Sequence, residues 1–199
     1  PNTNYTDTNW TFSNITLEPD NDPVTTASFP NINGVPLPIL YMTMDSNGTG
    51  NVTDYAMGNN GTVSGAFFNA TGGSEYGAYE FDGNDSIKID PFLGQPTGNA
   101  SFSISVWVKF NSLNSDLYYQ HPIITFGVDS AQPTAYGLSY TGATPKLYAT
   151  FSSANGAVTG ESTLLTGQWY HIVAVYNGTT NTVYLNGVLD GSVNYAGGS

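Results

Sequence analysis

Two stretches of the chain are rich in the side-chain oxygens that bind hard cations. Asp82, Asn84 and Asp85 fall within one glycine-containing segment, and Asp45 and Asp54 flank another. Calcium takes about six to eight oxygen ligands from carboxylates, amides and carbonyls, so these residues are candidate calcium ligands. The alternative is a pair of turns in which the Asp and Asn side chains cap their own backbone. No EF-hand spacing supports the calcium interpretation, and no other cofactor is expected.

The residues that commonly carry catalysis are few. Cysteine is absent, which removes thiol catalysis, disulfides and cysteine-based zinc sites. His121 precedes Pro122 and is expected in a loop, while His171 lies in an apolar run beside Trp169, where a hydrogen-bonded packing role is expected. No Gly-x-Ser-x-Gly motif is present. The chain is therefore not expected to be an enzyme.

Aromatic side chains offer a second kind of chemistry, the stacking of sugar rings. Trp107 lies opposite the apolar side of its predicted strand, so it is a candidate for an exposed sugar-binding position. Further candidates in or near the middle loops are Tyr118, Tyr119, Tyr136, Tyr140 and Tyr148. The alternative for any single tyrosine is a place in the core or in a protein interface.

The net charge narrows the class of partner. Three lysines and no arginine stand against 15 acidic residues, which gives a formal net charge of -12. A protein that binds nucleic acid needs cations to displace counterions from the phosphates, so nucleic-acid binding is excluded. An anionic membrane surface is disfavoured for the same reason. No stretch approaches the roughly 18 apolar residues of a spanning helix, so no membrane insertion is expected.

Ten asparagines occupy the pattern Asn-x-Ser/Thr, against roughly four to five expected by chance. The excess indicates N-glycosylation and an extracellular protein at the cell surface. The alternative is that a composition rich in Asn and Thr produces the pattern without modification. The ten candidate acceptors are Asn4, Asn9, Asn14, Asn47, Asn51, Asn60, Asn69, Asn84, Asn99 and Asn177.

The elements that must position these residues have the pattern of β-strands. Apolar alternation or apolar runs predict strands over 103–110, 146–151, 170–176, 182–185 and 188–193. Asn186-Gly187 separates the last two runs, which is typical of a tight hairpin because both turn residues take positive φ. Short strands with frequent turns predict an all-β sandwich or barrel.

The N-terminal part differs from the rest in its many prolines and its lack of a core pattern. Residues 1–36 are predicted to form an extended arm, followed by a single domain over residues 37–199. Within the arm, residues 10–17 have the pattern of one strand. Trp10 and Phe12 share one face of it, and Ile15 and Leu17 share the other.

From residue 38 onward the sequence resembles the laminin-G-like (concanavalin A-like lectin/glucanase) domains. The matching segments are 39–65, 78–89, 101–110 and 167–191, in the order that the family uses. The last segment, GQWYHIVAVYNGTTNTVYLNGVLDG, is the most specific. The resemblance implies a β-sandwich of the jelly-roll type, with calcium commonly bound where the two oxygen-rich loops come near each other.

The same resemblance bears on catalysis. Glucanases of this fold carry alternating carboxylates on one strand, which act as nucleophile and acid. The nearest match is Glu80, Asp82 and Asp85, in which the last position is Asp and the segment lies on the family's structural turn. The resemblance therefore does not imply a glycosidase here.

Domains of this family usually end in a further strand that pairs with their first strand, whereas this sequence ends at Ser199 soon after the hairpin. A missing strand would leave unpaired backbone groups at an open edge. Residues 10–17 are the candidate donor strand for the same chain or for a neighbouring copy, and a longer parent chain is the third alternative. Donation to a neighbour would give a head-to-tail filament.

These observations together predict a non-catalytic, glycosylated, extracellular structural protein. Its partners would be copies of itself, joined by donor-strand exchange into a filament or pilus-like thread. The alternative is a carbohydrate-binding, lectin-like adhesion module whose binding depends on calcium, with glycans as its partners.

Overall fold

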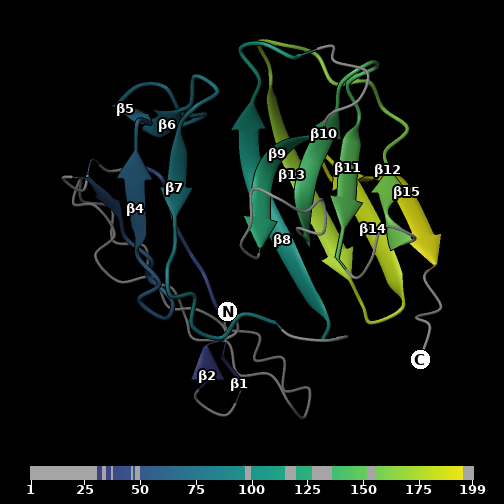
Figure 1. Ribbon diagram of the computed structural model, residues 1–199, viewed down its shortest axis with the longest axis horizontal. Coiled ribbons are helices and arrows are strands. Elements are labelled where there is room, and N and C mark those ends of the chain that lie inside the picture. Colours follow the sequence, from purple (N-terminus) through teal and green to yellow (C-terminus); the bar gives the residue numbers. More distant parts are fainter. Residues whose placement is uncertain are drawn as a thin grey trace, which may run out of the picture. The chain divides into compact units, whose positions relative to one another are not determined.

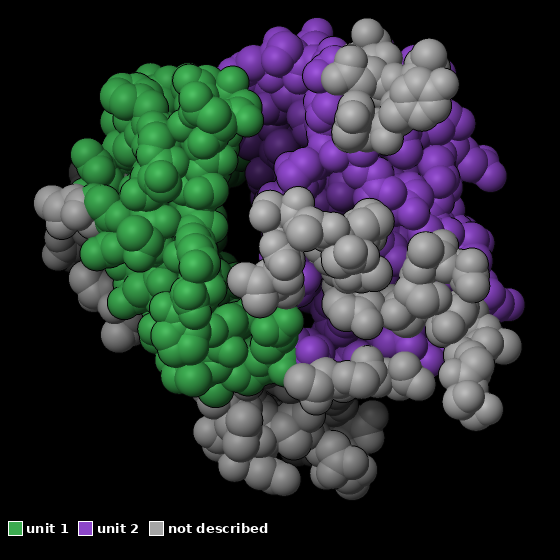
Figure 2. All heavy atoms as spheres, viewed as in Figure 1, with its two compact units in different colours: residues 1–95 green, residues 96–199 purple. Residues whose placement is uncertain are grey.

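The computed structural model describes residues 31–32, 35–36, 38–45, 47, 50–96, 100–114, 120–126, 136–151 and 156–194. The chain divides into two compact units, residues 1–95 and 96–199 (Figure 2). The boundary predicted after residue 36 falls inside the first unit, beside residue 37, which is not described. The arm and the candidate donor strand at 10–17 lie outside the described residues, so both stay predictions.

The first unit is built from short antiparallel strands. Its strands are β1 (Asn31–Ile32), β2 (Val35–Pro36), β3 (Asn51–Val52), β4 (Gly61–Ser64), β5 (Phe67–Asn69), β6 (Ala78–Glu80) and β7 (Ser86–Lys88). They form a two-stranded β1-β2 ribbon, a three-stranded sheet in the order β3-β4-β7, and a β5-β6 pair (Figure 1).

The second unit contains two four-stranded antiparallel sheets (Figure 1). Their strands are β8 (Phe102–Lys109), β9 (Gln120–Phe126), β10 (Tyr136–Thr141), β11 (Leu147–Thr150), β12 (Val158–Thr159), β13 (Trp169–Tyr176), β14 (Thr180–Leu185) and β15 (Val188–Asn194). One sheet has the order β12-β11-β10-β9 and the other the order β15-β14-β13-β8.

The apolar core of the chain lies between these two sheets. Leu138 and Leu147 of the first sheet and Ile172 of the second have no exposed surface. Phe102 packs edge-on against Phe151, with 4.8 Å between the ring centroids. Burying each such side chain contributes about 1.5–3 kcal/mol, so this cluster is the main source of stability in the second unit.

The structure confirms the predicted all-β fold, and the two sheets of the second unit form a sandwich. The expected hairpin forms between β14 and β15, and Asn186 (φ 52°) and Gly187 (φ 80°) occupy its turn. The strands predicted over 103–110 and 170–176 are observed as β8 and β13. The described residues include no α-helix, and in particular no helix with the length and apolarity to cross a membrane.

Candidate functional site

The β15-β14-β13-β8 sheet has one face in the core and one face in solvent. Along β13, Tyr170, Ile172, Ala174 and Tyr176 are buried, while the residues between them are half-buried. This alternation follows from the two-residue period of a strand, which sends successive side chains to opposite faces. We call the solvent side of this sheet the outer face. It carries the side chains of Ser103, Ser105, Trp107, Lys109, Trp169, His171, Val173, Val175, Thr180, Thr182, Tyr184, Leu189, Ser192 and Asn194.

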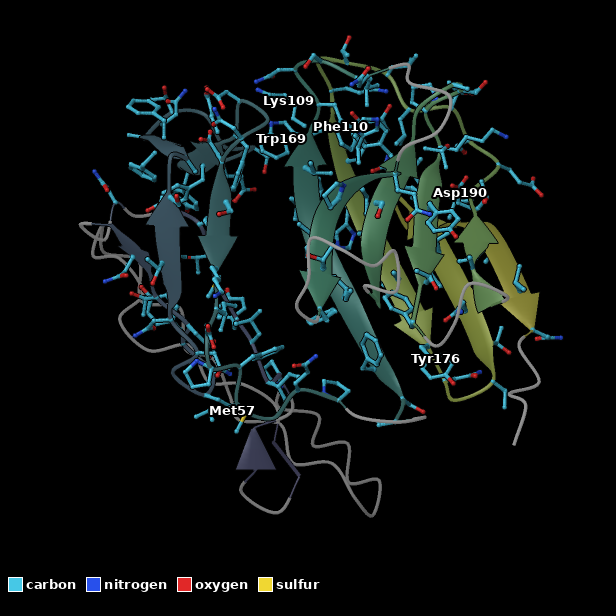
Figure 3. The ribbon with its side chains drawn as sticks, viewed as in Figure 1. Met57, Lys109, Phe110, Trp169, Tyr176 and Asp190 are labelled. Atoms are coloured by element: carbon cyan, nitrogen blue, oxygen red, sulfur yellow. The ribbon has the colours of Figure 1, made fainter. Side chains whose placement is uncertain are left out.

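Four of these side chains form what we call the tryptophan cluster: Trp107, Lys109, Trp169 and His171. The register between β8 and β13 places Trp107 opposite His171 and Lys109 opposite Trp169. The Trp107 and His171 rings are stacked, with centroids 5.0 Å apart and planes inclined by 21°. The Lys109 Nζ lies 5.3 Å from the centre of the Trp169 ring, and Figure 3 shows the two residues side by side where β8 ends and β13 begins.

Contacts hold both the ring and the backbone of His171. Ser105 Oγ lies 2.9 Å from His171 Nε2. The backbone N–H of His171 donates to Asn186 Oδ1 (2.9 Å), and Asn186 returns a backbone bond to the His171 carbonyl (2.8 Å). The hairpin turn therefore fixes the backbone of His171, while Ser105 and Trp107 contact its ring. Trp107 itself remains 57% exposed, which leaves a rigid aromatic surface open to a ligand.

Away from the cluster, the outer face is lined with hydroxyls and amides. Thr180 Oγ1 donates to Asn194 Oδ1 (2.8 Å), and the hydroxyls of Thr182 and Ser192 lie 3.1 Å apart. The register places both pairs at least four residues along the strands from Trp107, so the hydroxyl next to the tryptophan is that of Ser105. An exposed tryptophan beside a hydroxyl is an arrangement that can bind a sugar, because the ring stacks and its hydroxyls form hydrogen bonds.

In the loop around Asp54, unlike on the outer face, the polar side chain is buried and bonded within the protein. Asp54 is 5% exposed, and its carboxylate accepts backbone N–H groups from Tyr41 (2.7 Å), Ala56 (2.9 Å), Met57 (3.0 Å) and Asn59 (2.8 Å). Burial alone raises the pKa of this carboxyl, but the four N–H groups outweigh burial and hold the pKa below its usual value.

The amide of Asn59 completes this loop. Its Nδ2 donates to the carbonyls of Ile39 (2.9 Å) and Leu93 (3.1 Å), and its Oδ1 accepts the N–H of Leu93 (2.7 Å). Asp54 and Asn59 thus join three separate segments of the first unit. The side-chain oxygens and the amide nitrogen of these two residues are hydrogen-bonded to backbone groups of the same unit.

This geometry bears on the candidate calcium ligands. The oxygens of Asp54 face four N–H donors, so this donor set does not fit a cation at Asp54. In the other loop, Asp85 Oδ2 accepts the N–H of Asp82 (2.9 Å) and Asp82 Oδ1 accepts the N–H of Asn84 (3.4 Å), as in the alternative of self-capping turns. The carboxylate of Asp45 accepts the hydroxyl of Thr43.

In the described part of the chain, no group of three or more acidic, His or Cys side chains is arranged to hold a metal ion. Calcium binding stays a prediction, and it now concerns Asp45, Asp82, Asn84 and Asp85.

The predicted glycosylation sites fall into three groups. Asn47, Asn51, Asn60, Asn84 and Asn177 are exposed. Asn69 is half-buried and its Nδ2 donates to Glu80 Oε1 (2.7 Å). Asn4, Asn9, Asn14 and Asn99 lie outside the described residues. Glycosylation stays a prediction at all ten positions.

The other aromatic candidates are placed differently from Trp107. Tyr140 is 9% exposed and belongs to the core, which is the alternative to sugar binding, and Tyr148 is half-buried in β11. Tyr118, Tyr119 and the side chain of Tyr136 lie outside the described residues. His121 was expected in a loop but lies in β9, where it stacks on Tyr140 with ring centroids 4.6 Å apart.

The sequence pattern did not indicate Trp169 and Lys109 as residues of a site. Both occupy outer positions in strands whose alternation was visible, but only the register between β8 and β13 brings them together. His171 was expected to be a hydrogen-bonded packing residue, and its contacts with Ser105 and Trp107 agree with that expectation.

Comparisons with known proteins agree with this architecture. The chain matches the concanavalin A-like lectin/glucanases superfamily over residues 81–199, more than half of its length. A similar solved structure is domain 4 of AbnA, a GH43 extracellular arabinanase from Geobacillus stearothermophilus, in complex with arabinotriose. It has a TM-score of 0.52 and 20% identity over 71% of this chain and 69% of that chain. A search of curated proteins gave no match. As the resemblance predicted, the chain belongs to the concanavalin A-like lectin/glucanase superfamily.

Proposed function

We propose that this protein is a non-catalytic, extracellular carbohydrate-binding module that binds an oligosaccharide on the outer face of the β15-β14-β13-β8 sheet. The observation that carries the proposal is Trp107, which is 57% exposed and held by a stacked, hydrogen-bonded His171. An exposed tryptophan costs solvation free energy unless a ligand covers it, and a sugar ring covers it well.

Two features of the comparisons support this proposal. The family includes lectins, and the similar arabinanase domain was solved with arabinotriose. That arabinanase is an extracellular enzyme, which agrees with an extracellular place for this chain. A binding role without catalysis is favoured because none of the described strand residues on the outer face carries a carboxylate that could act as nucleophile or acid.

A glycan array followed by tryptophan fluorescence tests the proposal. A sugar stacked on Trp107 changes the emission of that indole, so a binding glycan shifts the spectrum of the wild type. The variant Trp107→Phe keeps an aromatic surface and loses the spectral change from this position. A glycan that binds with the same spectral change in Trp107→Phe would place the site elsewhere.

Self-assembly by strand donation stays a second prediction. Its supporting observation is that β8 and β9 are edge strands of their sheets within the described residues. An open edge accepts a further strand from a donor. Size-exclusion chromatography of the full chain against a deletion of residues 1–36 tests it, and monomers in both cases would contradict it.

A further inference from the structure

We infer that the oligosaccharide bound on the outer face is acidic, with the carboxylate of a hexuronate beside Lys109. This inference rests on the proposed function and narrows its ligand. The first observation is the distribution of acidic residues. The protein carries 15 acidic residues, yet none of the described strand residues on the outer face is Asp or Glu. Asp190 of β15 turns its side chain inward and is 6% exposed.

The inward turn of Asp190 has a structural cause. The register between β14 and β15 shifts at this point, since Val183 pairs with Gly191 and Tyr184 pairs with Leu189. Asp190 is therefore the extra residue of a β-bulge, a feature that redirects one side chain. Its Oδ1 accepts the N–H of Ser162 (2.9 Å) in the core-side loop, so its charge is kept away from the outer face.

Lys109 supplies the positive charge on this face. The chain has only three cationic side chains besides its histidines, namely Lys88, Lys109 and Lys146. Lys88 pairs with Asp90 at 2.9 Å, whereas Lys109 forms no ion pair with any described residue. Its ammonium lies over Trp169 instead. A ring contact attracts a cation weakly and leaves its N–H donors open to an anion.

The spacing of the cluster suits a sugar acid. Lys109 follows Trp107 by two residues on β8, so the two side chains leave the same face roughly 7 Å apart. A pyranose stacked on Trp107 therefore brings a carboxylate on its rim within reach of the flexible Lys109 side chain. The Ser105 hydroxyl lies on the other side of Trp107, where it can meet a ring hydroxyl of the same sugar.

The same charges limit the class of acidic ligand. A single ammonium neutralises a single carboxylate, and the net charge of -12 repels a densely charged chain. Highly sulfated polymers are therefore disfavoured. The expected ligand has one hexuronate among neutral sugars, or a short run of hexuronates.

Pairs of acidic and neutral oligosaccharides distinguish this inference from sugar binding that does not depend on the carboxylate. The probes are short oligosaccharides that contain galacturonate or glucuronate, each titrated beside its carboxyl-reduced, neutral counterpart. We expect one acidic form to bind about five- to tenfold more tightly than its neutral counterpart at low salt, and the difference to shrink as salt is added.

Lys109→Gln is expected to remove this preference, because the acidic form loses more affinity than the neutral form. The control is Lys146→Gln, which changes the net charge equally at a lysine that immediately precedes β11 of the other sheet. Melting temperatures of the two variants check that both fold. Equal affinity for acidic and neutral forms, or an equal loss of both in Lys109→Gln, would overturn the inference and leave the proposed function standing. Absence of binding to any glycan, acidic or neutral, would contradict the proposed function itself.

Discussion

The loop around Asp54 and the outer face of the second unit use polar and aromatic residues in opposite ways. In the loop, the carboxylate of Asp54 and the amide of Asn59 are buried and meet backbone groups of their own unit. On the outer face, Trp107 is exposed and the ring of His171 stacks on it. Buried polar groups that are fully paired stabilise a fold, whereas a fixed but uncovered aromatic surface remains available for a ligand.

This contrast matters because the sequence made Asp54 one of the candidate calcium ligands. It lies in an oxygen-rich stretch that suggests calcium. The structure shows that the oxygens of this residue accept four N–H groups. We therefore expect substitutions at Asp54 to reduce stability, and substitutions around Trp107 to reduce binding.

The largest expected effect on stability comes from Asp54→Ala. The substitution leaves buried N–H groups without an acceptor, which we expect to lower the free energy of unfolding of the first unit by about 3 kcal/mol. The control is Asp45→Ala, where the carboxylate is exposed. Urea unfolding followed by circular dichroism measures both variants. Equal losses would show that the N–H cluster contributes nothing beyond an ordinary surface contact.

A second buried carboxylate extends the comparison into the second unit. A methyl group added at Gly160 would overlap Asp190 Oδ2. Gly160→Ala is therefore expected to cost about 2 kcal/mol through overpacking. Gly187→Ala, where a methyl group meets no atom but φ is positive, is expected to cost about 1 kcal/mol. Thermal melts of both variants measure which substitution costs more stability. An unchanged melting temperature in Gly160→Ala would show that the Asp190 side chain can move to make room for the methyl group.

Acid should weaken the Asp54 loop. The pKa of Asp54 is lowered in the folded state, so its contribution to stability is present above the unfolded-state value near 3.8 and is lost as the pH falls through the folded-state value. We expect the stability of the wild type to fall more steeply below about pH 4 than that of Asp54→Asn. Parallel pH dependences for the two proteins would contradict this role.

The smallest expected effect concerns the hydrogen bond that holds His171. Ser105→Ala removes the hydroxyl 2.9 Å from His171 Nε2 and should weaken glycan binding about two- to threefold. Ser103→Ala changes the next outer position of the same strand and should leave the affinity unchanged. Calorimetric titration of both variants with the same glycan distinguishes a specific effect from a general change of the strand.

Local patterns predicted much of the fold of the second unit. Alternation along 103–110 placed Trp107 in solvent, and Asn186-Gly187 fixed the last hairpin, because both signals depend on neighbouring residues only. The tryptophan cluster needed the pairing of β8 with β13, whose residues are far apart in the sequence. Similarly, the environment of Asp54 includes the N–H of Tyr41, and Asn59 bonds to Leu93, contacts that no local pattern shows.

The most direct measurement compares the affinity of a glycan for Trp107→Ala and for Phe67→Ala. Both positions carry an exposed aromatic side chain, 57% exposed at Trp107 and 68% at Phe67. We predict that Trp107→Ala weakens binding by about 30-fold or more, while Phe67→Ala leaves it unchanged. An unchanged affinity in a correctly folded Trp107→Ala would contradict the assignment of the outer face as the carbohydrate-binding site.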